Sequence, residues 1–559
     1  MEFIDFYKKF IFSKSKERNT MLGELKSRKI NEPFNWVSEI FEKIFAGNDK
    51  DAIIYINEST GEERRISYRR LYESYNQFIN FLRTEGINKG SSVYIMAGSI
   101  PEQWVVMMGA LKAGFIVIPT APNLTWYELN YRFSQDSPDV IISDEASTEK
   151  LEHVLNTEAL KLVIGNREGW ISFNEIYKME VNAEPAELGK DDLFIKYFTS
   201  GTTGMPKAVR HSSILYPIGQ LSTVTAIGIR PEYIHNNLSS PGWAKFAWSS
   251  FFAPLCAGAT VLSIDYRGRL NSSRYLELID RYKVNTFCAP PTAWRQFISL
   301  KNLNIELKHL KETVSAGEPL NGEVIKKWKE RYGTVIRDFY GQSESTAMVA
   351  NLEGEEPVPG SMGKPLKSYN LVLVDDDMNL ITHPLNIGNI AVGDYTGTYG
   401  LFLGYSDREK DASVFVNGYY LTGDKAYFDD NGYFYFISRT DDVIKTSDYR
   451  VGPFEVESAI IKNEAVLESA VIGIPDSMKY EKIKAFVILK EGYVKSEETA
   501  KSIHSTVKTL LPTYKCPRVI EFTDELPKTI SGKIKRKELK QLELERANNG
   551  VEYNYTYDF

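Results

Sequence analysis

In the first third of the chain, short apolar runs alternate with longer stretches of helical spacing, and this rhythm restricts the chain to few folds. The run SVYIMAG (92–98) has the composition of a buried strand. The next stretch, EQWVVMMGALKAG (102–114), has helical apolar spacing and ends at Gly114, a residue suited to closing a helix. The strand-like runs DVIISD (139–144) and LVIG (162–165) continue the series. Strand, helix and strand at this spacing predict parallel βαβ units.

A second series with the same alternation follows between residues 259 and 341. A helical segment, RYLELIDRYK (274–283), lies within it. Its predicted strands are ATVLSI (259–264), VNTFCAP (284–290), KETVSAG (311–317) and VIRDFYG (335–341). The last two run directly into small or polar residues, which is typical of strands that end in turns.

Beyond residue 366 the pattern changes. YNLVLVDDDMNLI, GNIAVGDYTG and GYFYFISR alternate like antiparallel strands. After Arg439 the chain becomes α+β with shorter elements, and the polar tail NNGVEYNYTYDF is expected to fray. We therefore expect two domains, residues 1–440 and residues 441–559.

The composition is that of a soluble globular protein with more than one core. The chain has 559 residues, of which 43% are hydrophobic and 25% charged. Its formal net charge of −7 argues against a nucleic-acid-binding surface, because such domains are usually strongly basic. The sequence gives no indication of the oligomeric state.

The cysteines and the N-terminal residues indicate the cellular compartment and whether the chain inserts into a membrane. The widely spaced Cys256, Cys288 and Cys516 fit neither a disulfide framework nor a zinc site. The N-terminal segment lacks the apolar core of a signal peptide, and no run approaches the length of a membrane span. The amphipathic stretch FIDFYKKFIF is interpreted as a docking helix. We expect a cytoplasmic protein without stable membrane insertion.

The stretch TSGTTGMPK (199–207) is the first candidate for chemistry. It is not a Walker A loop, whose spacing is GxxxxGK[ST]. Its two glycines permit backbone N–H groups to converge on an anion, and its hydroxyl residues and lysine add donors and positive charge. The loop alone fits a phosphate cradle and a solvated turn equally well. The residues concerned are Thr199, Ser200, Gly201, Thr202, Thr203, Gly204 and Lys207.

The loop and seven further segments, in the same order along the chain, resemble the adenylate-forming superfamily of acyl-CoA synthetases, adenylation domains and luciferase. The segments are NTFCAPPTAWR (285–295), SAGEPLN (315–321), DFYGQSES (338–345), GSMGKP (360–365), the stretch 419–445, YRVGPFEVESA (449–459) and ELPKTISGKIKRKEL (525–539). The segments FCAPPTA, SAGEPLN and ISGKIKR are most similar in sequence to those of the medium-chain acyl-CoA synthetases.

The resemblance implies a fold and a reaction. The fold would be α/β, with a large N-terminal domain of stacked α/β sheets, a β-rich subdomain and a small mobile α+β C-terminal domain. The reaction would join a short, medium-chain or branched carboxylic acid to AMP with release of pyrophosphate, and would then pass the acyl group to CoA. ATP, Mg²⁺ and CoA are the implied cofactors. Such transfers need charge neutralisation and positioning more than covalent help from the protein.

Several implied ATP contacts follow from the matched segments. Glu344 would hold Mg²⁺, which prefers oxygen ligands, and Ser343 would donate to the α-phosphate. The implied adenine slot consists of Gly317, Glu318, Pro319, Asp338, Phe339 and Tyr340, and the neighbouring Gly341 and Gln342 are further implied ATP contacts. Taken singly, Glu344 also fits a helix-capping or solvated residue, and Tyr340, an aromatic residue that ends a strand, also fits the core.

The implied catalytic lysine lies near the C-terminus. Lys533 would stabilise the charge that develops between carboxylate and phosphate. Without the match to SGKIKR it would be one lysine on a basic surface segment. Asp424 and Arg439 would hold the ribose, and Asp441 lies where the family places its hinge.

Trp243, Lys245 and Trp248 match the segment that lines the acid pocket. Two indoles shorten an apolar pocket, which favours short, medium or branched acids over long fatty chains. Ordinary helix–sheet packing is the alternative interpretation.

The chain departs from the family where CoA passes. The implied tunnel segment is Ser447, Asp448, Tyr449 and Arg450, and Asp448 stands where relatives have glycine. Tyr480 also replaces a usual glycine. We therefore hypothesise that thioester formation is slowed, or redirected to a carrier-protein pantetheine or an amine, while adenylation is intact.

Overall fold

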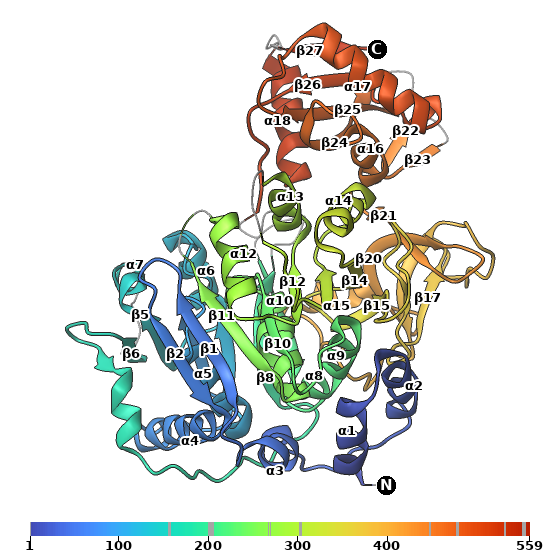
Figure 1. Cartoon of the computed structure of the whole chain (residues 1–559). Helices are drawn as coiled ribbons and strands as arrows, with labels where there is room; N and C mark the ends of the chain where they lie inside the picture. The colour runs from blue at the N-terminus through green and yellow to red at the C-terminus, as the bar shows by residue number, and fades with distance from the viewer. Residues whose placement is uncertain are drawn as a thin grey trace. The chain divides into compact units, whose positions relative to one another are not determined.

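The computed structural model describes residues 2–154, 158–199, 206–266, 268, 270–300, 305–446, 449–476, 480–529, 533–549 and 555–559. The chain divides into two compact units (Figure 1). The first unit comprises Met1–Leu320, Val324–Leu371 and Val392–Tyr419, and the second comprises Asn321–Glu323, Val372–Ala391 and Tyr420–Phe559. The expected division into domains of residues 1–440 and 441–559 stays a prediction.

The first unit contains a seven-stranded sheet. Its strand order is β7–β6–β5–β3–β4–β8–β9, and every neighbouring pair is parallel except β8–β9. The strands are β3 (Ser92–Met96), β4 (Ile116–Pro119), β5 (Val140–Asp144), β6 (Leu160–Ile164), β7 (Ile171–Ser172), β8 (Leu193–Thr199) and β9 (Lys207–Ser212). Helix α5 (Glu102–Ala113) joins β3 to β4 and ends at Gly114, whose φ is 73°. The predicted βαβ units are confirmed.

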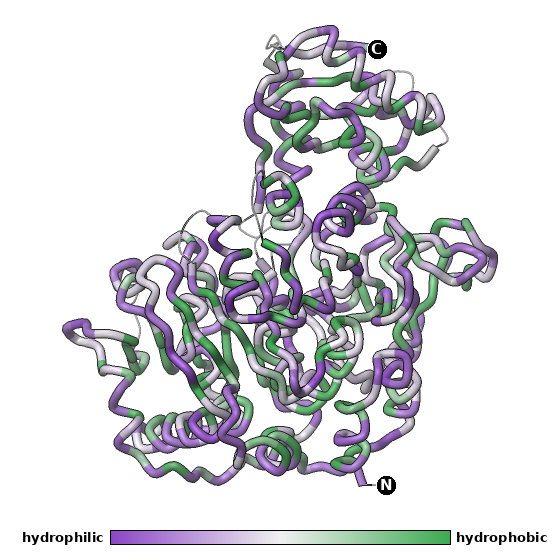
Figure 2. Tube along the Cα trace, in the orientation of Figure 1, coloured by the Kyte–Doolittle hydropathy of each residue, from purple (hydrophilic) through white to green (hydrophobic). Residues whose placement is uncertain are grey.

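A nine-stranded sheet forms the second layer of this unit. Its order is β16–β15–β14–β13–β12–β10–β11–β1–β2, and the strands from β14 to β1 are parallel. The strands are β1 (Asp51–Asn57), β2 (Glu63–Ser67), β10 (Ile234–Asn237), β11 (Thr260–Asp265), β12 (Thr286–Ala289), β13 (Glu312–Ser315), β14 (Ile336–Gly341), β15 (Ala347–Ala350) and β16 (Lys364–Pro365). Helices α12 (Ser272–Arg281), α13 (Pro291–Ser299) and α14 (Gly322–Tyr332) contribute buried aromatic side chains to its core. Apolar segments lie along the strands in Figure 2.

A smaller sheet follows residue 366, where antiparallel strands are predicted, and its β20–β21 pair is antiparallel. Its order is β17–β18–β20–β19, with β21 also pairing with β20. The strands are β17 (Leu371–Val374), β18 (Gly388–Gly393), β19 (Phe415–Val416), β20 (Tyr419–Phe428) and β21 (Phe434–Arg439).

The C-terminal part of the second unit is an α+β fold with a six-stranded sheet of order β23–β22–β25–β26–β27, and β24 pairs with β25. Its elements are β22 (Ile444–Thr446), β23 (Tyr449–Val451), α16 (Pro453–Ile460), β24 (Val466–Asp476), β25 (Tyr480–Leu489), α17 (Glu497–Leu510), β26 (Val519–Phe522), α18 (Arg536–Asn549) and β27 (Thr556–Asp558). The expectation of a frayed tail is wrong, because β27 pairs with β26 and the Phe559 ring stacks on His504.

The predicted docking helix is present as α1 (Phe3–Phe12), and Phe6, Tyr7 and Phe10 are buried. Among the helices of the described residues, none combines the length and apolar character that spanning a membrane requires.

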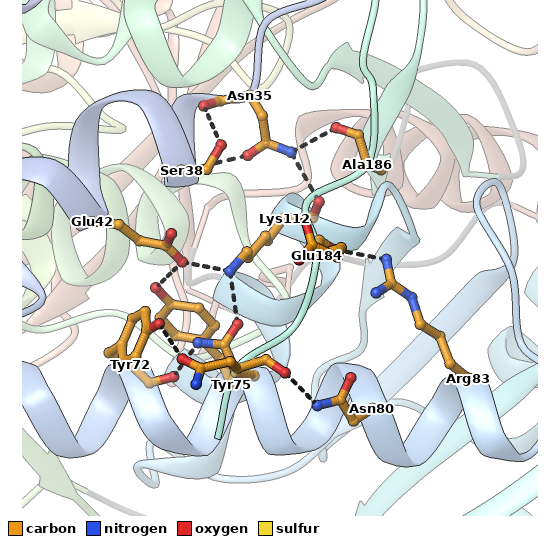
Figure 3. Close-up of polar contacts among 12 residues, drawn as sticks. Asn35, Ser38, Glu42, Tyr72, Tyr75, Asn80, Arg83, Lys112, Glu184 and Ala186 are labelled. Atoms are coloured by element: carbon orange, nitrogen blue, oxygen red, sulfur yellow. Dashed lines mark hydrogen bonds and ion pairs between the residues drawn. The ribbon is translucent and has the colours of Figure 1, made fainter. Parts of the chain in front are cut away.

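A buried lysine ties the early helices of the first unit together (Figure 3). Lys112 on α5 is only 3% exposed, and its Nζ lies 2.7 Å from Glu42 Oε1 and 2.8 Å from Asn76 Oδ1. Tyr75, on α4 (Tyr68–Thr84), donates its hydroxyl to the same Glu42 oxygen at 2.7 Å. Burial and the nearby carboxylate raise the pKa of Tyr75. The ammonium group therefore has charge and hydrogen-bond partners within the core.

Candidate active site

The segment TSGTTGMPK lies at the β8–β9 hairpin. Thr199 ends β8, Lys207 begins β9, and the two residues are paired across the hairpin. Ser200, Gly201, Thr202, Thr203 and Gly204 lie outside the described residues. The Lys207 ammonium lies 2.7 Å from Asp407 Oδ2, so the lysine at the end of the loop is held by a carboxylate. Both ends of the candidate phosphate loop are thus fixed by neighbouring structure.

A short segment from residue 402 to residue 407 connects this hairpin to Glu344. On one side it pairs with β9, because Arg210 N donates to Gly404 O at 3.1 Å and Leu403 N donates to Arg210 O at 2.8 Å. On the other side Phe402 N donates to Glu344 O at 2.8 Å. The hydroxyl of Tyr405 donates to Glu344 Oε1 at 2.7 Å. The candidate metal ligand and the candidate phosphate loop are therefore positioned by one segment.

Glu344 and Ser343 lie in the turn between β14 and β15. The turn is closed by two hydrogen bonds, from Gln342 N to Ser345 Oγ at 3.0 Å and from Ser345 N to Gln342 O at 3.1 Å. The carbonyl oxygen of Ser343 accepts a hydrogen bond from His211 Nε2 at 2.7 Å. The turn is therefore held both internally and by β9.

The implied adenine residues meet at one edge of the nine-stranded sheet. Ser315 and Asp338 are paired on the parallel strands β13 and β14, so the residues that follow both strands emerge side by side. Gly317 has a φ of 101°, a value that favours glycine. Tyr340 is half-buried, as a stacking face requires, whereas Phe339 is buried on the opposite face of the strand. Burial raises the pKa of Asp338 well above its usual range.

The candidate acid-pocket residues lie beside this edge. Trp248 is 4% exposed, and its Nε1 donates to Tyr216 Oη at 2.9 Å. A Cβ built on Gly341 would lie 3.0 Å from Trp248 Cη2, so the indole packs directly against the end of β14. Lys245 is half-buried, and its Nζ donates to Ala316 O at 3.3 Å. The structure therefore brings acid-pocket and nucleotide candidates together.

Trp243, the other indole of the candidate acid pocket, is half-buried. The preceding Gly242 has a φ of 97°, and a Cβ on it would lie 2.5 Å from Ala121 N. This glycine lets the Trp243 segment approach the chain that follows β4.

The ribose candidates belong to the second unit. Asp424 and Arg439 face each other on β20 and β21, with 3.8 Å between Arg439 Nε and Asp424 Oδ1. Asp424 is buried, whereas the side chain of Arg439 is 47% exposed. Asp441 is exposed in the turn that follows β21. The pair brings a carboxylate and a guanidinium together.

Lys533 is exposed in the second unit, beside Ile534, which forms an antiparallel bridge with Lys528. Its backbone N donates to Thr529 Oγ1 at 3.0 Å, and Thr529 N donates to Lys533 O at 2.7 Å. The neighbouring Lys528 is paired with Glu468 at 2.7 Å. Within the described part of the chain, no carboxylate forms an ion pair with Lys533. The side chain of Lys533 thus presents an ammonium group to solvent.

Two predicted tunnel residues, Ser447 and Asp448, lie outside the described residues. Tyr449 and Arg450 belong to β23, which pairs with β22. Their side chains, and that of Tyr480 at the start of β25, are likewise outside the described part. The tunnel hypothesis therefore stays a prediction.

The donor set suits a magnesium ion that arrives with phosphates. Among the described residues there is no group of three or more His, Cys, Asp or Glu side chains that could hold a metal. Mg²⁺ characteristically uses one or two carboxylates together with substrate phosphates and water. A single oriented carboxylate, that of Glu344, fits this requirement.

Sequence reasoning missed Tyr405 and Asp407. Both lie more than sixty positions after Glu344, so no pattern of neighbouring residues links them to it. The signal that was present is the polar and aromatic character of GYSDREK, next to a strand-like run.

Comparison with known proteins agrees with this geometry. The profile of the family described as AMP-binding enzyme matches residues 42–406. The profile of the AMP-binding enzyme C-terminal domain matches residues 455–533. Together they cover the parts of the chain that hold most of the residues described above.

Individual relatives are similar over nearly the whole chain. The 4-hydroxybutyrate–CoA ligase 1 of Metallosphaera sedula is 48% identical, and the match covers 98% of each chain. The mitochondrial acyl-coenzyme A synthetase ACSM3 of Rattus norvegicus is 37% identical over 87% of this chain and 86% of its own length. The anthranilate CoA ligase AuaEII, solved in complex with anthranoyl-AMP, superposes with a TM-score of 0.85 at 29% identity, covering 93% of this chain and 99% of that one. This chain therefore belongs to the AMP-binding enzyme family.

Proposed function

We propose that this protein joins a short carboxylic acid to CoA, with 4-hydroxybutyrate as the first candidate. The chain is an AMP-forming ligase that uses ATP, Mg²⁺ and CoA. A carboxylate oxygen attacks the α-phosphorus of ATP and pyrophosphate leaves. The thiol of CoA loses its proton, its sulfur attacks the acyl carbon, and AMP leaves with the electron pair of the cleaved C–O bond.

The observation that carries the proposal is the place of Trp248. Its indole lies against Gly341, at the start of the turn that holds Ser343 and Glu344, and its Nε1–H is bonded to Tyr216. An indole fixed at both its edge and its N–H cannot swing away at low cost. A rigid wall this close to the turn favours an acid of few carbons. The relative that is 48% identical is named for such an acid.

We assign a role in the reaction to each candidate residue from its charge and its hydrogen-bonding groups. We assign Mg²⁺ binding to Glu344, α-phosphate contact to Ser343, and the phosphate loop to residues 199–204 with Lys207. We assign the ribose to Asp424 and Arg439, and stabilisation of the transferring α-phosphate to Lys533. Mg²⁺, when bound, neutralises phosphate charge, and Tyr405 orients the carboxylate that would hold it.

We also propose that residues 441–559 move as a lid about Asp441. Lys533 and the tunnel segment around Asp448 both belong to this part. Support comes from the exposed position of Asp441 in a turn between two sheets. The three free cysteines, all buried, agree with activity in a reducing compartment, for which the cytoplasm is our proposal.

CoA is the acceptor that the relatives favour over a carrier protein or an amine. We therefore expect Asp448 to lower the rate of thioester formation, the second half-reaction, and not to change the acceptor. An acyl group that reached only a carrier protein would contradict this assignment.

The test is a panel of acids from acetate to octanoate, including 4-hydroxybutyrate, assayed for pyrophosphate release with and without CoA. We expect release that depends on acid, is highest for four- or five-carbon acids, and gives thioester when CoA is added. Lys533→Met should lower adenylation by about 100- to 1,000-fold, the usual effect of removing a transition-state donor. Lys537→Met, an exposed lysine nearby, is the control and should leave the rate unchanged. Highest activity with octanoate would overturn the choice of acid, and an active Lys533→Met would overturn the assignment of the lysine.

A further inference from the structure

We propose that His211 and Tyr216 are positioning residues that link the wall of the acid pocket to the turn that holds Ser343 and Glu344. The inference rests on the proposed function of that turn. It assigns a role to two buried side chains that touch neither ATP nor acid in the scheme above.

His211 acts on the turn through one hydrogen bond. It belongs to β9, is fully buried, and its Nε2 lies 2.7 Å from the carbonyl oxygen of Ser343. A carbonyl oxygen only accepts, so Nε2 carries the proton and Nδ1 carries the lone pair. Nδ1 has no hydrogen-bond partner among the described residues. A second proton on this ring would have no acceptor, and burial lowers the pKa of His211 to about 3. The ring is therefore a neutral donor with one fixed tautomer.

Tyr216 lies flat on this imidazole. The two ring centroids are 3.8 Å apart and the planes differ by 25°. The Tyr216 hydroxyl accepts the Trp248 Nε1–H at 2.9 Å and lies 3.4 Å from the Tyr197 hydroxyl. Burial raises the pKa of Tyr216, so the hydroxyl stays neutral. The tyrosine thus contacts the histidine with its face and the indole with its edge.

These contacts close a ring around the turn. Trp248 packs against Gly341 at the start of the turn, and His211 bonds Ser343 two residues later. The packing at Gly341 is too close for a side chain, because a Cβ would lie 2.5 Å from Thr346 O and 3.0 Å from Trp248 Cη2. A displacement of the indole by an ill-fitting acid is therefore transmitted to the turn directly at Gly341 and, through Tyr216 and His211, at Ser343. This arrangement makes the choice of acid and the placement of Glu344 interdependent.

The competing explanation is that His211 only fills space in the core. Two substitutions of His211 distinguish this packing role from a role of its hydrogen bond. His211→Phe keeps a ring for Tyr216 to stack on but removes the donor to Ser343. His211→Gln removes the ring but keeps an N–H of similar reach. If the hydrogen bond positions the turn, His211→Phe should raise the Mg²⁺ concentration for half-maximal pyrophosphate release about tenfold, within the range for residues that orient a metal ligand. His211→Gln should return it to within about threefold of wild type. KM for the acid should change little in His211→Phe, which keeps the ring under Tyr216.

Tyr216→Phe tests the other end of the link. It keeps the stacked ring and removes the acceptor of Trp248. We expect a several-fold rise in KM for the acid, weaker discrimination between four- and eight-carbon acids, and a non-additive effect when it is combined with His211→Phe. Tyr94→Phe is the matched control, because Tyr94 is also buried and its hydroxyl donates to Asp136 O at 2.7 Å outside the site. It should change the unfolding midpoint and leave the kinetics unchanged.

The inference fails if His211→Phe matches wild type in Mg²⁺ dependence. It also fails if His211→Gln is as impaired as His211→Phe, or if the effects at residues 211 and 216 simply add. The proposed function fails in a different way, through a wild-type protein that releases no pyrophosphate with any acid of the panel.

Discussion

Tyr405 donates its phenolic hydrogen to Glu344, with 2.7 Å between Tyr405 Oη and Glu344 Oε1. The same residue forms a bridge with Val209 on β9, beside the phosphate hairpin. Tyr405 thus pairs with the strand beside the phosphate loop and also holds the carboxylate proposed to bind Mg²⁺.

Removing this hydroxyl should weaken the response to magnesium. Tyr405→Phe keeps the ring and frees one rotation of the Glu344 carboxylate. We expect the Mg²⁺ concentration for half-maximal adenylation to rise about 10-fold, with KM for the acid unchanged. A titration of pyrophosphate release against Mg²⁺ measures this. Glu344→Gln should weaken the response to Mg²⁺ further. A Tyr405→Phe titration curve that overlays that of wild type would show that the hydroxyl does not orient Glu344.

The length of the acid should respond to Trp248. Trp248→Phe shortens the wall and removes the N–H that Tyr216 accepts, so longer acids gain space. We expect the ratio of kcat/KM for hexanoate to that for butyrate to rise about 10-fold, the scale of a few methylene contacts. Trp328→Phe, a buried indole on α14 whose Nε1 donates to Thr334 at 2.9 Å, serves as the control. Equal ratios in wild type and Trp248→Phe would show that the indole does not bound the pocket.

Asp448 should act only on the second half-reaction. Asp448→Gly removes both bulk and charge from the expected path of the CoA thiol, whereas Asp448→Asn removes charge alone. We expect thioester formation to become several-fold faster in Asp448→Gly, with acid-dependent pyrophosphate exchange unchanged. A single-turnover assay from preformed acyl-AMP measures the step. Equal and fast rates in all three proteins would show that the aspartate offers no obstruction.

The buried Lys112 should be among the most sensitive positions for stability. Lys112→Met removes the cation that lies 2.7 Å from Glu42 and leaves a carboxylate without its charge partner. Breaking a buried pair in this way costs about 3–5 kcal/mol, and we expect guanidinium unfolding at a clearly lower midpoint. Lys43→Ala removes an exposed partner of Glu39 and should cost about 0.3–0.5 kcal/mol. Comparable shifts in the two variants would mean that burial adds nothing to the Lys112 pair.

Local periodicity predicts much of the first unit. The strands at 92–98 and 139–144, and the helix that Gly114 ends, follow from apolar spacing alone. So does the position of polar residues at the ends of β13 and β14, where parallel strands present their carboxyl ends at one edge. These features depend on neighbours in sequence, which a single chain displays.

What escaped prediction depends on contacts between distant residues. The Tyr405–Glu344 bond spans 61 positions and the Lys112–Asn76 bond spans 36, and neither has a periodic signature. The polar composition of the tail predicts fraying, yet Tyr557 packs against Phe522 at 5.9 Å between ring centroids and gives β27 an apolar side. Alternate aromatic residues in that tail were the usable signal.

The pairing of residues 403–406 with β9 has a consequence for synthesis of the chain. β9 is the last strand in its sheet order, and its outer hydrogen-bonding edge is completed by a segment about 190 residues further on. At roughly 5–20 residues per second, translation leaves that edge bare for about 10 to 40 s. Nascent chains arrested in this interval should therefore be the ones most prone to edge-to-edge association and most in need of chaperone cover.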